Sequence, residues 1–176
     1  MVIWRGFSKF EYNFLYMKNT LLVIAVLIGL SSCKKDKFTT APQIEFVDIN
    51  PNFASADLLS TSPEALFPKL VFNITDAEGD FGNDPSSPQD SSWIYIKHLL
   101  TMRVDSLRFP DLRQAPKSNF DAEVTANLFP NFVECVSPGP SLPRVDTVFF
   151  EVYVRDAKGN KSNVITTTKP LLTECR

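Results

Sequence analysis

Acidic side chains recur at alternate positions in one short segment of this chain, where Asp76, Glu78 and Asp80 are separated by Ala77 and Gly79. Hard cations such as Ca²⁺ take several oxygen ligands at about 2.3–2.6 Å, and a turning backbone must gather those ligands. The pattern supplies both the carboxylates and the turn. It is not an EF-hand, because the sixth and twelfth positions counted from Asp76 are not glycine and glutamate. The segment predicts a calcium-binding loop.

A second turn carries further oxygen atoms at Asp156 and Asn160. In a β-sandwich the strand before Asp76 and the strand before Asp156 run toward the same end, so the turns that follow them are neighbours. The candidate cofactor is therefore Ca²⁺, held by a set of five residues: Asp76, Glu78, Asp80, Asp156 and Asn160. The composition of these loops favours the alternative, a plain solvated turn whose carboxylates cap backbone N–H groups.

The sequence contains few residues or motifs that indicate catalysis. His98 is the single histidine, it lies between a lysine and a leucine, and we expect it on the surface of a strand. The chain contains no Gly-x-Ser-x-Gly motif and no histidine pair for zinc. We predict a protein without enzymatic activity. A small hydrolase that draws its carboxylate pair from the acidic segment is the third and weakest interpretation.

The N-terminal part of the chain has the pattern of an export signal. Lys18 precedes an apolar run over Leu21–Leu30, and Ser31-Ser32-Cys33 closes it like a bacterial lipobox. The run is shorter than the roughly 20 apolar residues of a membrane-spanning helix. A transmembrane anchor and an ordinary cleaved secretory signal are the alternatives. We predict a signal peptide over residues 1–32, with Met17 as an alternative start, and a lipid on Cys33.

Removing the signal leaves two other cysteines, Cys135 and Cys175. An exported chain with an even number of remaining cysteines favours a disulfide, which would join the C-terminal strand to a proline-rich loop. Two unpaired thiols are the alternative. We predict the Cys135–Cys175 disulfide.

The region after the signal has the patterning of an all-β domain. Short runs that alternate apolar and polar residues are separated by proline, glycine and aspartate, and 13 prolines interrupt any long helix. We predict a tether over residues 33–42 and, over residues 43–176, an antiparallel immunoglobulin- or fibronectin-like β-sandwich of about seven strands. A small closed barrel is the rival fold. The predicted strands are Gln43–Ile49, Lys69–Thr75, Trp93–Ile96, Leu99–Leu107 (as an extension or a strand of its own), Phe120–Leu128, Asp146–Arg155 and Ser162–Lys169.

Charge excludes one class of partner. The chain has 18 lysines and arginines against 20 aspartates and glutamates, a formal net charge of −2. Nucleic-acid binding needs a concentrated basic face, and no such cluster is present beyond the short Lys34–Lys37 segment, which fits a solvated tether. We therefore expect no nucleic-acid partner.

Two segments of the chain resemble segments of a known group of proteins. Phe72–Gly82 looks like the strand and Asp-rich turn of small Bacteroidetes-type lipoproteins, and Tyr153–Thr167 resembles their closing hairpin. The start Ser31–Asp36 fits as well. The resemblance implies an immunoglobulin-like β-sandwich of largely unknown function. Ala77 and Glu78 replace the glycine and aspartate usual in that turn, which weakens any metal site.

The combined expectation is a lipoprotein of the cell envelope, anchored to the outer membrane on its periplasmic side or at the cell surface. Its partners would be the membrane, through the lipid on Cys33, and an envelope protein or a glycan. We predict a binding or assembly module. The alternative is a glycan-binding accessory module of a surface polysaccharide-uptake system, which exposed rings of Trp93 and Tyr95 would favour.

Overall fold

The structure is a computed structural model, and it describes residues 37–82, 91–109, 118–136, 139 and 141–176. The segment Lys37–Arg176 forms one compact unit. The predicted signal peptide and the predicted lipidation site at Cys33 lie outside the described residues. Within the described ranges, no helix has the length and apolar character needed to cross a membrane.

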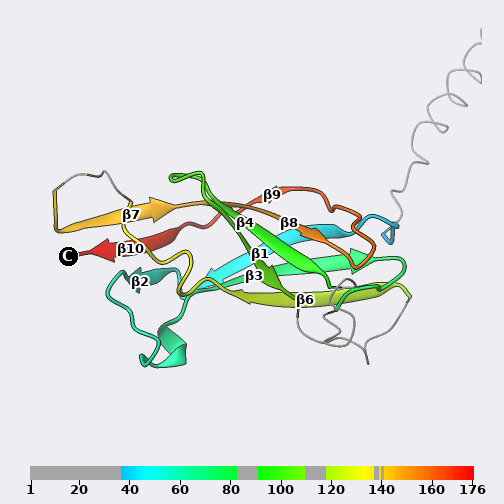
Figure 1. Cartoon of the computed structure of the whole chain (residues 1–176), viewed down its shortest axis with the longest axis horizontal. Helices are drawn as coiled ribbons and strands as arrows, with labels where there is room; N and C mark the ends of the chain where they lie inside the picture. The colour runs from blue at the N-terminus through cyan, green and yellow to red at the C-terminus, as the bar shows by residue number, and fades with distance from the viewer. Residues whose placement is uncertain (1–36, 83–90, 110–117, 137–138, 140) are drawn as a thin grey trace, which may run out of the picture. The chain divides into compact units, whose positions relative to one another are not determined.

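The described part of the chain is all-β, as predicted, with ten strands and a single turn of 3₁₀-helix (Figure 1). The elements are β1 (Gln43–Asn50), β2 (Phe53–Ser55), η1 (Glu64–Leu66), β3 (Lys69–Asp76), β4 (Trp93–His98), β5 (Val104–Arg108), β6 (Phe120–Asn127), β7 (Arg144–Val148), β8 (Phe150–Arg155), β9 (Ile165–Thr166) and β10 (Leu171–Cys175).

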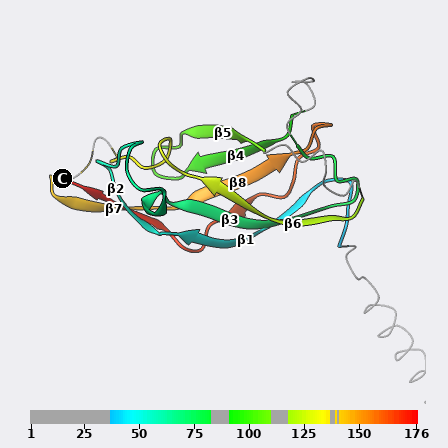
Figure 2. The same ribbon diagram turned by 90° about the horizontal axis from the view of Figure 1, so that it is seen from below.

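The strands form three sheets with the orders β1-β3-β6, β2-β10-β7 and β5-β4-β8-β9. All neighbours are antiparallel except β2 and β10, which are parallel. Figure 2 shows β4 and β5 on one side of the body and β1 and β3 on the other. The fold therefore places its core between layers of sheet.

Alternation of side chains along each strand builds this core, because successive residues of a strand point to opposite faces. Val148, Phe150, Val152 and Val154 are all fully buried, as the pattern predicts. Along β3 the buried positions are Leu70, Phe72, Ile74 and finally Asp76. The same alternation that buries apolar side chains thus carries a carboxylate into the interior at the end of β3.

The long strand predicted over Asp146–Arg155 is wrong as one element. The structure divides it into β7, which pairs with β10, and β8, which pairs with β4. Phe149, between them, belongs to neither strand. Burial continues to alternate across the division, so the local pattern gives no sign that the chain passes from one sheet to another.

The predicted strand Ser162–Lys169 reduces to the two residues of β9. The hydroxyl oxygens of Ser162 and Thr167 accept the backbone N–H groups of Val154 and Phe150, at 3.0 and 3.1 Å. These side chains satisfy donors that a regular neighbouring strand would satisfy with carbonyl oxygens. The structure contains two further strands that the sequence pattern did not predict: β2, which has only three residues, and β10.

Candidate metal centre

Asp76 is the last residue of β3 and is completely buried. Its Oδ2 atom accepts the backbone N–H groups of Gly79 at 2.7 Å and Glu78 at 3.2 Å, so the carboxylate folds the following turn onto itself. Gly79 has a φ of 61°, a left-handed conformation that glycine adopts without strain. The other oxygen, Oδ1, is buried and has no hydrogen-bond partner.

Asp156 follows β8 and is nearly as buried, at 2% exposure. Its Oδ1 accepts the backbone N–H of Asn160 at 2.8 Å, and its Oδ2 accepts the side-chain amide of Asn160 at 2.7 Å. Gly159, at the turn, has a φ of 85°. The Asn160 side chain therefore fixes the orientation of the Asp156 carboxylate.

A direct hydrogen bond joins the two turns, because the backbone N–H of Ala157 donates to the carbonyl oxygen of Asp80 at 3.0 Å. The tips of β3 and β8 lie at the same end of the body (Figure 1). Ser92, which directly precedes β4, contacts the end of the first turn: its hydroxyl accepts the N–H of Gly82 at 3.2 Å. The neighbouring turns predicted from the sequence are thus present.

Three carboxylates meet between these turns. Oxygen atoms of Asp76, Asp80 and Asp156 all lie within 4.8 Å of one another. Neither oxygen of Asp80 accepts a hydrogen bond, although the Nζ of Lys158 lies 3.2 Å from its Oδ2 as an ion pair. Buried carboxylates grouped in this way are hard oxygen ligands, and the group can hold a metal ion.

Electrostatics make the cluster costly without a cation. Burial raises the pKa of Asp76 from its ordinary value of 3.8 to about 6, and the hydrogen bond from Gly79 opposes this rise. The negative charges of Asp80, Glu78 and Asp156 raise this pKa further. Lys158 is the nearby counter-ion, and Asp80 raises the pKa of its ammonium, but this side chain is 63% exposed. Solvent therefore screens much of its attraction.

Only three of the five predicted ligands belong to the carboxylate cluster. Asp76, Asp80 and Asp156 form the cluster, and Asn160 uses its amide to hold Asp156. Glu78 lies outside the 4.8 Å group, although its Oε2 is buried without a hydrogen-bond partner. Lys158 was not singled out from the sequence; its position between Asp156 and Asn160 was the available signal.

A second polar cluster lies around β7 and β10, away from the tips of β3 and β8 (Figure 1). The structure joins Cys135 and Cys175 by a disulfide, with their Cα atoms 5.9 Å apart. Next to it, Oδ1 of Asp146 accepts a hydrogen bond from Nε of Arg144 at 2.8 Å, and Oδ2 accepts the N–H of Val136 at 2.8 Å. These contacts lower the pKa of Asp146, Arg144 contributing most.

The expectation that His98 lies on a strand surface is wrong. The ring is fully buried, edge-on to Phe150 with 5.7 Å between ring centroids. Its Nδ1 accepts the N–H of Thr101 at 3.1 Å, its Nε2 has no hydrogen-bond partner, and burial lowers its pKa. His98 shares the inward face of β4 with Ile94 and Ile96, so its burial follows from the alternation of that strand.

Comparison with known proteins gives no relative. The resemblance to small envelope lipoproteins therefore stays a prediction from the sequence. No protein-family model, no curated protein sequence and no solved structure matches this chain.

Proposed function

We propose that this chain is a non-enzymatic binding module of the cell envelope, held to a membrane by a lipid on Cys33 and stabilised at one end by Ca²⁺. Its all-β body would be an immunoglobulin-like β-sandwich. The working surface would include the two turns Asp76–Asp80 and Asp156–Asn160. A bound cation would lock these turns against each other and present them as one rigid surface.

One observation carries the cation in this proposal. Asp76 is completely buried, yet its Oδ1 has no hydrogen-bond partner and belongs to a group with Asp80 and Asp156. A buried carboxylate oxygen without a hydrogen-bond partner costs free energy, and like charges beside it add to that cost. A divalent cation removes both costs at once. Carboxylate oxygens favour Ca²⁺ or another hard cation over softer metals.

Ordered turns alone account for only part of this arrangement. Hydrogen bonds from Glu78, Gly79 and Asn160 satisfy one oxygen of Asp76 and both of Asp156. They leave Asp76 Oδ1 and the Asp80 carboxylate without a hydrogen bond. A turn that only caps its own backbone would leave few buried oxygen atoms without hydrogen bonds, whereas a cation site requires oxygen atoms that are free to coordinate the ion.

The glycan-binding alternative receives less support. Tyr95 is stacked on Tyr153 with 4.7 Å between ring centroids, and Arg108 lies over Trp93 at 4.9 Å. One face of each candidate ring is therefore already in contact with another side chain of the same sheet. Sugar rings bind to open aromatic faces, so these rings make a poorer platform than the sequence alone suggested.

A thermal-denaturation titration tests the cation. We expect Ca²⁺ added to protein stripped with EDTA to raise the melting temperature, by mass action on the folded state. Asp76→Asn and Asp156→Asn should each abolish most of this rise. Asp57→Asn, which changes an exposed carboxylate in another turn, should keep it. An unchanged melting temperature of the unmodified protein in excess Ca²⁺ removes the cation from the proposal.

Mass spectrometry tests the anchor separately. Full-length protein extracted from membranes should begin at Cys33 and carry the mass of attached acyl chains. Cys33→Ser should release the protein into the soluble fraction while leaving the Ca²⁺ response of its melting temperature intact. An unprocessed N-terminus in the membrane extract would contradict the lipid anchor and leave the cation site standing.

A further inference from the structure

The two long edges of the body differ in how they are closed. On one edge the side chain of Asn163 bridges to β1: its Oδ1 accepts the N–H of Ile44 at 2.8 Å, and its Nδ2 donates to the Ile44 carbonyl at 2.9 Å. Lys169 adds an ion pair to Asp48 at 2.8 Å. These contacts occupy the edge groups of β1, next to β9.

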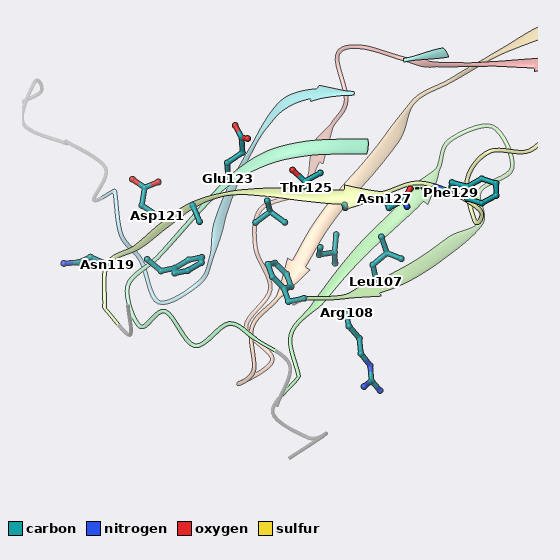
Figure 3. A pocket seen from close by; sticks show the side chains of 14 residues that line it. Leu107, Arg108, Asn119, Asp121, Glu123, Thr125, Asn127 and Phe129 are labelled. Atoms are coloured by element: carbon teal, nitrogen blue, oxygen red, sulfur yellow. Dashed lines mark hydrogen bonds between the residues drawn. The ribbon is translucent and has the colours of Figure 1, made fainter. Parts of the chain in front are cut away.

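On the other edge, where β5 and β6 end their sheets, the described residues form no such bridge. Among the described residues β6 pairs only with β3, and β5 pairs only with β4. A cavity of about 700 Å³ lies between them (Figure 3). Ile94, Leu107, Phe109 and Arg108, whose guanidinium lies over the ring of Trp93, line one side of this cavity, and β6 lines the other. We call this cavity the β5–β6 groove.

The lining of the groove shows which part of β6 it follows. Every residue from Asn119 to Asn127 contributes, although alternate side chains of a strand point to opposite faces. Figure 3 shows Asp121, Glu123 and Thr125 on the side of β6 away from Leu107. A cavity lined by consecutive residues therefore runs along the edge of the strand, where its backbone N–H and C=O groups lie.

We propose that the β5–β6 groove binds an extended segment of a partner protein, which adds a strand to the free edge of β6. Main-chain hydrogen bonds would supply affinity, and alternate side chains would supply specificity. Inward side chains of the segment would be apolar, to meet Phe120, Ala122 and Val124. This inference names a partner class for the binding function proposed above and does not depend on the cation.

Charge on β6 specifies the outward side chains of that segment. Asp121 is paired with Lys37, whereas Glu123 is exposed and has no cation within ion-pair distance among the described residues. A lysine or arginine opposite Glu123 would form a favourable cross-strand pair. The partner segment therefore alternates apolar and basic residues.

Two other occupants fit less well. An acyl chain would fill the apolar space but would leave the edge N–H and C=O groups of β6 without partners. A second copy of this chain, adding its own β6, would bring Asp121 and Glu123 of each copy close to the same acidic residues of the other. Like charges on paired strands are destabilising. The basic peptide avoids both costs.

The groove also touches the candidate metal centre. Phe81, in the acidic turn, packs against Phe109 and Phe120, with ring centroids 5.0 and 5.5 Å apart. Both of these partner rings line the groove. Ordering the acidic turn would thus order one end of the groove. The rest of its lining, on β5 and β6, does not include the carboxylates of the candidate metal centre.

A synthetic peptide tests the proposal directly. The probe is a capped peptide as long as β6, which has 8 residues, with lysine and valine alternating. We expect saturable binding in calorimetry and amide shifts in the NMR spectrum at β6. N-methylation at every lysine and N-methylation at every valine give two further peptides. One of these two should lose binding, because alternate N–H groups of a strand point to the same side.

Variants locate the site. Glu123→Lys should weaken binding of the lysine–valine peptide about three- to tenfold and strengthen binding of a glutamate–valine peptide. Glu45→Lys, which changes another exposed glutamate on β1 at the other edge of the same sheet, should change neither. Ala122→Leu should fill the groove and weaken both peptides at least about tenfold, with an unchanged circular dichroism spectrum.

Four results would overturn this proposal. The first is no binding of the lysine–valine peptide, with or without Ca²⁺. The second is equal binding of both N-methylated peptides. The third is saturable binding of dodecanoate at β6 amides without binding of the peptide, which would make the groove a site for small apolar ligands. The fourth is a dimer that forms in sedimentation and disappears in Ala122→Leu, which would make the occupant a second copy. Loss of the Ca²⁺ response with peptide binding intact would refute only the cation site.

Discussion

The two ends of the body each place a carboxylate beside the core, but the surroundings of these two carboxylates differ. Around β7 and β10, Asp146 accepts hydrogen bonds from Arg144 and lies next to the Cys135–Cys175 disulfide, and its pKa is lowered. After β3 and β8, Asp76 lies among other carboxylates and its pKa is raised to about 6. At the first end the charge of the carboxylate is balanced within the chain, whereas the group at the second end could hold a metal ion.

This difference separates two kinds of stability. A covalent bond and an internal ion pair stabilise the fold regardless of the ions in solution. Grouped carboxylates with too few hydrogen bonds raise the free energy of the folded state through mutual repulsion, and a cation that binds them stabilises the fold by mass action. The first end therefore acts as a permanent closure. In our proposal, the stability of the second end depends on the cations in solution.

Removing the Cys135–Cys175 disulfide should have the largest effect on the free energy of unfolding. The disulfide spans 40 residues, and in the chain-entropy model replacing both cysteines by serine should lower the free energy of unfolding by about 4 kcal/mol. Chemical denaturation should give the same loss in EDTA and in Ca²⁺, because the two ends are independent. A loss that depends on Ca²⁺ would show that the ends are coupled.

The second effect is a pH dependence that belongs to the acidic end alone. The pKa of Asp76 is about 6 in the folded protein against an ordinary 3.8, so the folded state holds its proton more tightly. The stability that Asp76 contributes to metal-free protein is therefore fully present well below pH 3.8 and is lost as the pH rises through 6, with about 2 kcal/mol of the loss between these two values. Denaturation in EDTA across this range measures the loss.

Asp76→Asn is the control for that measurement. The variant cannot ionise at this position, so its decline between pH 3.8 and 6 should be much smaller than that of the unmodified protein. Asp146 has the opposite sign: its pKa is lowered, so its contribution is present above pH 3.8 and is lost as the pH falls through the folded value. A decline that Asp76→Asn leaves unchanged would assign the titration to another group.

Exchanging one carboxylate at each end by asparagine sharpens the contrast at neutral pH. Asp146→Asn removes a partner from Arg144 and should cost about 2 kcal/mol in both EDTA and Ca²⁺. Asp76→Asn should stabilise metal-free protein, because it removes a buried like charge, and should destabilise the protein in Ca²⁺. The same sign for both variants in EDTA would contradict the comparison.

The smallest expected effect concerns Lys158. Its ammonium lies 3.2 Å from Asp80 and competes with a bound cation for that carboxylate, but it is largely exposed. Lys158→Met should raise the affinity for Ca²⁺ about threefold at low ionic strength, with less effect at high salt. Lys161→Met, whose ammonium lies over the ring of Tyr153 at 4.1 Å, is a matched control and should leave the Ca²⁺ affinity unchanged.

Much of the site could be predicted because its parts are local. Asp76 through Asp80 and Asp156 through Asn160 each form one turn, and the hydrogen bond from Ala157 to Asp80 joins the two turns. The error at His98 was avoidable, since Ile94, Ile96 and His98 occupy one face of β4. The roles of Glu78 and Lys158 were not predictable, because side-chain reach across two turns depends on their exact spacing in the fold.

The sequence by itself determined which faces of the strands are buried and which turns carry carboxylates, because side-chain direction alternates along a strand whatever that strand pairs with. Only the tertiary structure decided that Asp146–Arg155 contributes to two sheets and that, within the described residues, β6 pairs with β3 alone. It also decided that Asp76 is left with an unpartnered oxygen. Strand pairing joins residues far apart in the chain, and local alternation contains no information about which neighbour a strand will find.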